Sequence, residues 1–328
     1  MDWRDQLKEL WKRFNWSGTA VFELPGVLFE IQPDFVMGAR LAGNGSRDHG
    51  VAQFGRLAMK ALPPDTIAPA LAGPSILNQA TLTIAVEEVV RRIGNGSTEV
   101  GLLVPDGLAR IGVLPFEALP ESRREAATLI GWNLRDGLPF PPEEARIAYQ
   151  LLPKAEADRT ELVAVAARAS VLKEYESLFE EVNRSSSLLL PTTLALLPLL
   201  HEAEDAVLLI HAYGNAATLA VVSGRHLRFW RTRDFERLEP KELLAQIGAE
   251  AARVLASSAD RLGISIESVR LCARPPAGNE WVGELAQILG CKVNALEPAA
   301  GAGGLLAAEE RSLLGCYGAT LAGLAANR

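Results

Sequence analysis

The hydrophobic pattern of the chain contains two groups of three short apolar runs. In residues 206–232 the runs VLLIHAY, ATLAVVS and HLRFWRT are separated by Gly214-Asn215 and Ser223-Gly224, dipeptides that favour tight turns between antiparallel strands. Earlier in the chain, VLFEIQ, FVMGARL and VAQFGRLAMKAL are separated by Pro33-Asp34 and by the loop Gly43–Gly50. Each group predicts a three-stranded antiparallel meander. Because a helical pattern follows each meander, we expect two related halves.

Between the meanders, the pattern predicts a compact module. Residues 99–116 form two apolar runs with a turn at Pro105-Asp106-Gly107, a helical pattern covers Glu121–Asp136, and the strand-like runs ARIAYQLL and TELVAVAARA follow. This layout predicts a small α+β module inserted into the first half. The other predicted elements are helices at Ser75–Ile93, Val171–Ser185, Pro240–Leu262, Asn279–Leu289 and Ala302–Ala326, strands at Val269–Arg274 and Cys291–Leu296, and a buried apolar connector at Leu188–Leu200.

The first residues, Met1–Trp16, are predicted to form an amphipathic helix, because large apolar side chains recur there at helical spacing and charges fill the other side. A helix this short is marginal alone and must dock. Three docking surfaces are compatible with this pattern, namely the protein itself, a membrane interface and a partner protein. The predicted domains are this helix (1–17), the first half in two parts (18–97 and 169–205) around the inserted module (98–168), the second half (206–300) and a C-terminal helix (301–328).

Composition and charge narrow the classes of function. The 328 residues are 48% hydrophobic and 22% charged, which is ordinary for a globular protein of two domains. The net charge of -7 argues against nucleic acid as a partner, because no run of Lys and Arg is dense enough to neutralise several phosphates. Three cysteines without C-x-x-C spacing indicate reduced thiols and no metal site. With no signal peptide and no apolar run long enough to span a bilayer, we expect a cytoplasmic protein.

The most distinctive stretch, Gly101–Leu152, contains LLVPDGLARIGVLP, a helical segment and GLPFPPEEARIAYQLL. Its Gly137–Pro141 run, Glu143-Glu144 and Tyr149–Leu152 resemble, in order, a signature of the PilM family. These are actin-like cytoplasmic proteins of the type IV pilus machine, related to FtsA. The resemblance implies an α/β, actin-like (ribonuclease H-like) two-lobed fold with a small α+β inserted module.

The same resemblance implies partners. PilM-like proteins hold the cytoplasmic N-terminal segment of a single-pass membrane protein, PilN, near the inserted module, and the type II secretion protein GspL has a comparable cytoplasmic domain. The chain would then be a scaffold at the inner face of the inner membrane, touching other pilus or secretion platform components, with peripheral membrane association through the partner or the N-terminal helix. The residues matched to the region near the insert are Leu108, Arg110, Ile111, Pro139, Phe140 and Tyr149.

ATP and magnesium are the family's ligands, and the first meander has lost the pattern that holds them. The family's D-I-G-S-S-S-V-K falls on EIQPDFVM, so that Glu30 replaces the Asp, Gln32 replaces the Gly and Met37 replaces the Lys. Pro33 has no N–H to donate to a phosphate. Asp34 places a carboxylate where phosphate should lie, and like charges repel.

The second and third nucleotide sites of the family are altered as well. In the second meander, D-I-G falls on His211, Ala212 and Tyr213, with Gly214 one position late. An imidazole prefers softer metals than magnesium. At the third site, Arg274 and two prolines stand where the family has a Gly-Gly turn against the adenosine. We therefore expect no cofactor, no catalytic residue and a vestigial nucleotide cleft.

The competing hypothesis is a nucleotide-binding actin-like ATPase or phosphotransferase with divergent phosphate loops. Glu30 would then act as a carboxylate base and His211 as a general acid or base. The preferred hypothesis is a scaffold without ATP hydrolysis, in which an extended peptide gains affinity from backbone pairing beside the inserted module.

Overall fold

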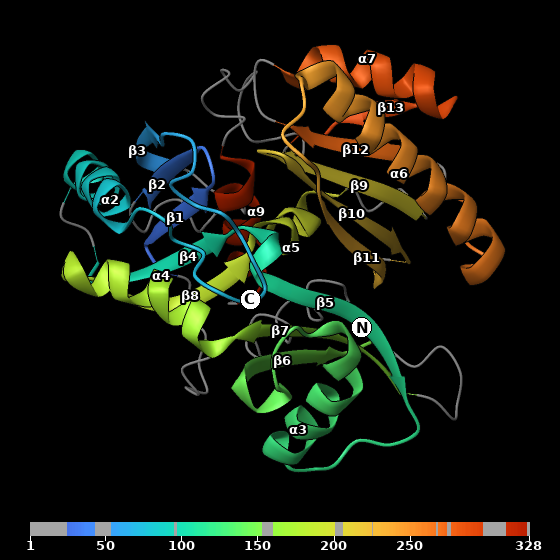
Figure 1. The fold of residues 1–328 in the computed structure, drawn as a ribbon, viewed down its shortest axis with the longest axis horizontal. Helices are drawn as coiled ribbons and strands as arrows, with labels where there is room; N and C mark the ends of the chain where they lie inside the picture. The colour runs from blue at the N-terminus through green and yellow to red at the C-terminus, as the bar shows by residue number, and fades with distance from the viewer. Residues whose placement is uncertain are drawn as a thin grey trace. The chain divides into compact units, whose positions relative to one another are not determined.

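The computed structural model describes residues 25–42, 54–94, 97–152, 160–200, 206–224, 226–266, 268–273, 277–297 and 313–326 (Figure 1). The predicted N-terminal helix Met1–Trp16 and the loop Gly43–Gly50 lie outside these residues. The chain divides into two compact units, one made of Met1–Leu196 and Gly315–Arg328, the other of Leu197–Leu314.

The first unit is built on a five-stranded sheet in the order β3-β2-β1-β4-β8. Its first three strands are antiparallel neighbours, while β1, β4 and β8 run parallel. Every residue of β1 is buried, as expected for a central strand that is covered on both faces. The strands are β1 (Val27–Gln32), β2 (Phe35–Leu41), β3 (Phe54–Ala61), β4 (Glu99–Val104) and β8 (Ser185–Pro191).

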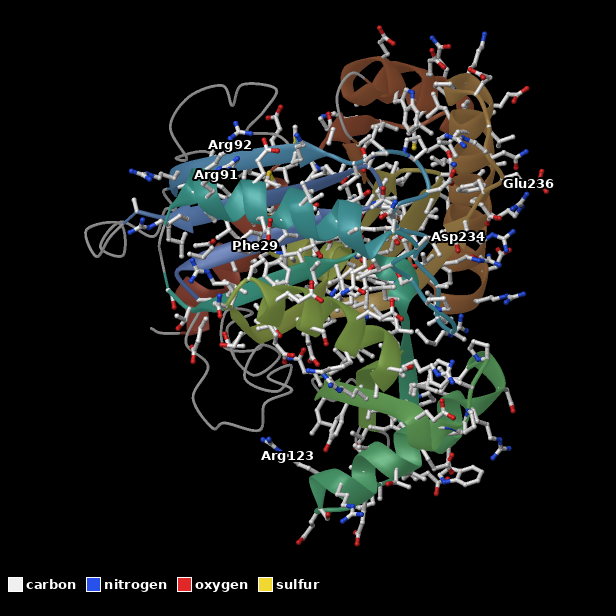
Figure 2. The ribbon with its side chains drawn as sticks, turned by 60° about the vertical axis from the view of Figure 1, so that its left-hand side comes forward. Phe29, Arg91, Arg92, Arg123, Asp234 and Glu236 are labelled. Carbon is white, nitrogen blue, oxygen red and sulfur yellow. The ribbon has the colours of Figure 1, made fainter. Side chains whose placement is uncertain are left out.

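Helices cover both faces of this sheet. On one face lie α2 (Gln79–Ile93) and α4 (Ala169–Glu181), where the rings of Phe29 and Phe179 meet edge to face at 4.8 Å. Figure 2 shows Phe29 on β1, and Arg91 and Arg92 in the last turn of α2. On the other face, the first turn of α9 (Leu314–Ala326) lies against β1.

The inserted module has a three-stranded antiparallel sheet in the order β5-β7-β6, with α3 (Arg123–Leu134) packed on one face. Its strands are β5 (Ala109–Phe116), β6 (Ala145–Leu151) and β7 (Thr160–Arg168), joined through the 3-10 turns η3 (Arg135–Gly137) and η4 (Pro142–Glu144). The arginine Arg146 of β6 forms a two-pronged ion pair with Glu176 of α4, which ties the module to the rest of the first unit.

The structure corrects the predicted start of the insert at residue 98. Strand β4 belongs to the main sheet, where it pairs with β1 and β8, and the turn η2 (Asp106–Leu108) leads from it into β5. Five of its six residues are buried, and such a continuous apolar run suits a parallel strand inside a sheet better than one side of a hairpin.

The second unit repeats the sheet order of the first, as β11-β10-β9-β12-β13. Three antiparallel strands are again followed by two parallel ones, so the predicted pair of related halves is present. The strands are β9 (Ala206–Tyr213), β10 (Ala216–Ser223), β11 (His226–Asp234), β12 (Ser268–Ala273) and β13 (Val293–Ala295).

Two helices pack together over the sheet of the second unit, α6 (Pro240–Leu262) and α7 (Ala277–Leu289). The bounds of α6 match the sequence prediction, because Pro240 suits the first helical position and Gly263 ends the helix in a left-handed conformation at φ 64°. The core between these helices and the sheet consists mainly of leucine, isoleucine and valine side chains.

Two other predictions differ from the structure. The apolar connector Leu188–Leu200 contains the end of β8, then α5 (Thr192–Leu196) and the 3-10 turn η5 (Leu197–Leu199). The last residues, predicted as a separate part over 301–328, form the expected helix in α9, and from Gly315 on they belong with the first unit. The connector was mispredicted because a short apolar run with prolines does not distinguish strand, helix and connector by itself.

Candidate functional site

The first predicted nucleotide site lies at the β1–β2 hairpin. Pro33 and Asp34 form a two-residue turn between the paired residues Gln32 and Phe35. Asp34 is exposed, whereas Glu30 and Gln32 are 4% and 1% exposed. The turn therefore presents Pro33 and the carboxylate of Asp34 to solvent, while the side chains of Glu30 and Gln32 point into the protein.

The amide of Gln32 joins two parts of the first unit. Its Nε2 donates to Thr192 Oγ1 at 2.9 Å and to Glu30 Oε1 at 3.4 Å. The hydroxyl of Thr192 in turn donates to the carbonyl oxygen of Val104 at 3.1 Å. The side chains of Gln32, Glu30 and Thr192 thus form a buried hydrogen-bonded group at the end of β1.

The carboxylate of Glu30 lies at the first turn of α9. A Cβ added to Gly315 would stand 2.6 Å from Glu30 Oε2, so only a glycine fits there without displacement. A negative charge at a helix N-terminus is favoured by the helix dipole. Burial and the charge of Glu30 together raise the pKa of the Cys316 thiol well above its usual value, so this cysteine stays protonated.

Sequence reasoning missed a second buried carboxylate, Asp106. It is 0% exposed and accepts hydrogen bonds from the backbone N–H of Thr193 at 2.9 Å and from the Thr193 hydroxyl. Asp106 thereby satisfies an N–H in the first turn of α5. The Pro-Asp-Gly sequence around it indicated only a turn, and no local signal linked it to a residue 87 positions away.

The second predicted nucleotide site lies at the β9–β10 hairpin of the second unit. Gly214 adopts φ 53° in the turn, and the rings of His211 and Tyr213 lie 4.9 Å apart. Both side chains are buried, and the hydroxyl of Tyr213 is 3.5 Å from that of Thr218. Arg274, the residue predicted for the third site, lies outside the described residues.

The described residues contain no group of three or more His, Cys, Asp and Glu side chains able to hold a metal ion. The structure brings Glu30 and Gln32 together within the first unit, and His211 and Tyr213 together within the second. Each pair is buried among side chains of its own unit, as described above.

The six residues matched to the peptide-binding region divide into two sets. Leu108, Ile111 and Phe140 are buried, so they cannot be wall residues of a binding surface in this conformation. Ile111 follows Arg110 on β5, and adjacent side chains of a strand point to opposite faces of the sheet, so the two differ in exposure. Arg110 and Pro139 are exposed and Tyr149 is half-buried, so these three remain candidates.

Arg110 occupies a defined place on the edge strand β5. Its guanidinium lies beside Gly137 of η3, where an added Cβ would be 3.1 Å from its Nε. The sheet order leaves β5 paired with β7 alone within the described residues. Its other edge carries backbone N–H and C=O groups that can pair with an added strand, except at Pro115, which has no N–H.

A neighbouring arginine missed by sequence reasoning fixes the Phe140 ring. The guanidinium of Arg168 lies 5.8 Å from that ring centre, and its Nε donates to Glu144 Oε2 at 2.8 Å. These contacts connect the end of β7 with the Pro-rich segment that carried the family signature. The signature residues thus have a structural role in the module, beside any role in binding.

No protein-family model matches the sequence, and no curated protein matches it. Among solved structures, a chain of the PilM-PilN type IV pilus biogenesis complex matches with a TM-score of 0.73 at 15% identity, covering 93% of this chain and 98% of that one. A Bacteroides thetaiotaomicron protein of unknown function, with an actin-like ATPase fold, matches with a TM-score of 0.52 at 12% identity, covering 89% and 96%. The chain has the actin-like fold.

The predicted α/β actin-like fold is thereby confirmed, and so is the likeness to the PilM-PilN complex at the level of fold. The cytoplasmic domain of EpsL, an inner membrane component of the type II secretion system of Vibrio cholerae, gives a TM-score of 0.47 at 11% identity, covering 88% and 94%. Within the described part of this actin-like chain, no helix has the length and apolar character needed to cross a membrane.

Proposed function

We propose that the protein is a cytoplasmic actin-like scaffold of a type IV pilus or type II secretion platform. It acts at the inner face of the inner membrane and holds the cytoplasmic N-terminal segment of a PilN-like membrane protein. The observation that carries this proposal is the match in fold, over 93% of the chain, to a chain of the PilM-PilN complex. The sequence signature of the insert, found independently of the fold, supports it.

The binding surface we propose is the outer edge of β5. A peptide that adds as a strand gains main-chain hydrogen bonds, and side-chain contacts set its register. Arg110 is exposed beside this edge, and it can bind a carboxylate or a backbone carbonyl of the peptide. Tyr149 shares the α3-facing side of the same sheet, and Pro139 is exposed in the segment that follows η3.

We further propose that the scaffold works without ATP hydrolysis. In the first unit, the Gln32 side chain stands where the family has glycine and is held by hydrogen bonds to Glu30 and Thr192, and the Glu30 carboxylate is packed against α9. The hairpin turn carries Pro33, which cannot donate an N–H to a phosphate, and the exposed carboxylate of Asp34, which repels one.

The test is copurification with the membrane partner. The full chain is coexpressed with the single-pass membrane protein encoded beside it, and the complex is isolated in detergent. We expect Arg110→Ala to reduce recovery of the partner about tenfold, since it removes a charged hydrogen bond at the binding edge. Arg123→Ala is the matched control, because Arg123 points away from the module in the first turn of α3 (Figure 2).

Recovery should be unchanged in the Arg123→Ala variant. Equal recovery with wild type and with Arg110→Ala would place the partner elsewhere on the chain. Failure of the wild-type protein to retain the partner at all would remove the proposed function.

A further inference from the structure

Strand β11 forms one edge of the sheet in the second unit. In the part of the chain that the structure describes, it pairs only with β10, in antiparallel register, so that Arg231 lies opposite Leu219 and Arg233 opposite Ala217. The outer backbone groups of an edge strand are a template for an added strand. This edge belongs to a different unit from the β5 edge discussed above.

Three arginines converge on one carboxylate beside this edge. Glu250 of α6 is 4% exposed, and its Oε1 lies 2.6 Å from Arg253 Nη1 and 3.1 Å from Arg233 Nε. Its Oε2 lies 3.7 Å from Arg231 Nη1. Three positive charges and one negative charge leave a surplus of two positive charges at this point of the surface.

The carboxylate of Glu250 can accept hydrogen bonds from only some of the N–H groups of the three arginines. Each guanidinium has five N–H donors, whereas Glu250 offers two oxygens. The side chains of Arg231, Arg233 and Arg253 are 45%, 49% and 61% exposed, so their remaining donors are accessible to a ligand. Guanidinium groups arranged in this way bind carboxylates in paired hydrogen bonds.

The spacing of two of these arginines selects the form of the ligand. Arg231 and Arg233 are two positions apart on β11, so their side chains lie on the same face of the strand, about 7 Å apart. Asp234, at the next position, lies on the opposite face of the strand, since successive side chains alternate. An extended segment added along this edge would carry its own alternate side chains opposite the two arginines, within reach of a cross-strand pair.

We propose that the edge of β11 binds an extended acidic segment of a partner protein, with Glu or Asp at alternate positions. The backbone of that segment pairs with β11, and its alternate carboxylates pair with Arg231 and Arg233. Arg253, which has the shortest contact to Glu250, keeps that carboxylate neutralised whether or not the segment is present. This binding edge in the second unit is independent of the role proposed for the inserted module in the first.

Two synthetic peptides of identical composition test the spacing. The probe Thr-Val-Glu-Val-Glu-Val-Thr has alternate carboxylates, and its isomer Thr-Val-Val-Glu-Glu-Val-Thr has adjacent ones. Binding to the full chain is measured by fluorescence anisotropy at low salt, where charge pairs are weakly screened. We expect the alternating probe to bind about threefold more tightly than its isomer, because two charge pairs form in place of one.

Variants then assign the binding to the two arginines. Arg231→Gln combined with Arg233→Gln should weaken binding of the alternating probe about tenfold, while Arg261→Gln, an exposed arginine in the last turn of α6, should not. Arg231→Glu combined with Arg233→Glu should transfer the preference to Thr-Val-Lys-Val-Lys-Val-Thr. A stabilising role for the arginines alone would not produce this reversal, and thermal unfolding checks that each variant is folded.

Three outcomes would overturn the proposal. One is equal binding of the two isomers, or no binding of either. Another is binding to vesicles with a phosphatidylserine fraction, lost in the double Gln variant, without binding of the alternating probe, because the ligand would then be a lipid surface. The last is a dimer of the free protein in sedimentation that the double Gln variant abolishes, because the edge would then bind a second copy.

Discussion

Buried polar side chains in the first unit are held by hydrogen bonds between elements that lie far apart in the sequence. Asp106, at the end of β4, accepts from both the backbone and the hydroxyl of Thr193 at the start of α5. Gln32 of β1 donates to Thr192 beside it. A buried polar group that loses its partner destabilises the fold by its desolvation cost, so these contacts fix the ends of β1 and β4 relative to α5.

Thr193→Val tests this account at the level of one side chain. The substitution keeps the shape and removes the hydroxyl that donates to the buried Asp106 carboxylate. We expect the free energy of unfolding to fall by about 1–3 kcal/mol, measured by urea denaturation. Thr128→Val is the control, because its hydroxyl donates to a carbonyl on the exposed side of α3 and its loss should change stability by less than about 0.5 kcal/mol. Equal effects of the two variants would contradict the account.

Helix α9 packs closely against β1 at Gly315, which has no side chain beyond a hydrogen atom. Glu30 Oε2 lies where the Cβ of any other residue at position 315 would extend, and Leu103 is also within 3.2 Å of that point. The close approach places the carboxylate at the N-terminus of α9, where the helix dipole favours a negative charge. The contact therefore depends on Gly315 as much as on Glu30.

Two glycine-to-alanine variants should have opposite signs. Gly315→Ala forces Glu30 away from α9 and should lower the free energy of unfolding by about 1–3 kcal/mol. In α7, a Cβ added at Gly283 would have no atom within 4 Å. Gly283→Ala should therefore raise the free energy of unfolding by up to about 1 kcal/mol, because alanine is the better helix former. Thermal and urea unfolding of both variants gives the comparison. Stabilisation by Gly315→Ala would mean that the glycine is not required by packing.

Local signals in the sequence were sufficient for some elements and insufficient for others. The bounds of α6 follow from a proline at its start and a glycine at its end, and the hairpins of β1–β2 and β9–β10 follow from their turn residues. Strand β8 carries no comparable signal, because its apolar residues and Pro191 suit a connector equally well. Which sheet β4 joins is decided by pairing with β1, about 70 residues earlier, and no local pattern encodes it.

The candidate site shows the same limit. Placing Glu30 and Gln32 on a strand end was possible from the apolar pattern, but their contacts with Gly315 and Thr192 join residues 285 and 160 positions apart. For Leu108, Ile111 and Phe140, matching to the family region selected positions without their orientation, and the structure buries all three. The arginine cluster on Glu250 was missed because its members come from β11 and α6.

At the scale of the whole molecule, two sheets of the same order carry helices at the same points of the chain, α2 and α4 in the first unit and α6 and α7 in the second. The first unit also holds the inserted module with its exposed edge at β5. The match to a chain of the PilM-PilN complex extends over nearly the whole chain, while the hairpin of the first unit carries side chains unsuited to phosphate. These facts support our proposal that this actin-like chain binds a peptide and works without ATP.

One calorimetric titration tests that claim most directly. The full chain is titrated with the cytoplasmic N-terminal peptide of its PilN-like partner, with and without about 1 mM ATP and magnesium. The account predicts saturable binding in the micromolar range, corresponding to about 8 kcal/mol, and the same dissociation constant in both conditions. A peptide affinity that changes severalfold with ATP would show that the nucleotide site is occupied and coupled to the peptide site, and would contradict the account.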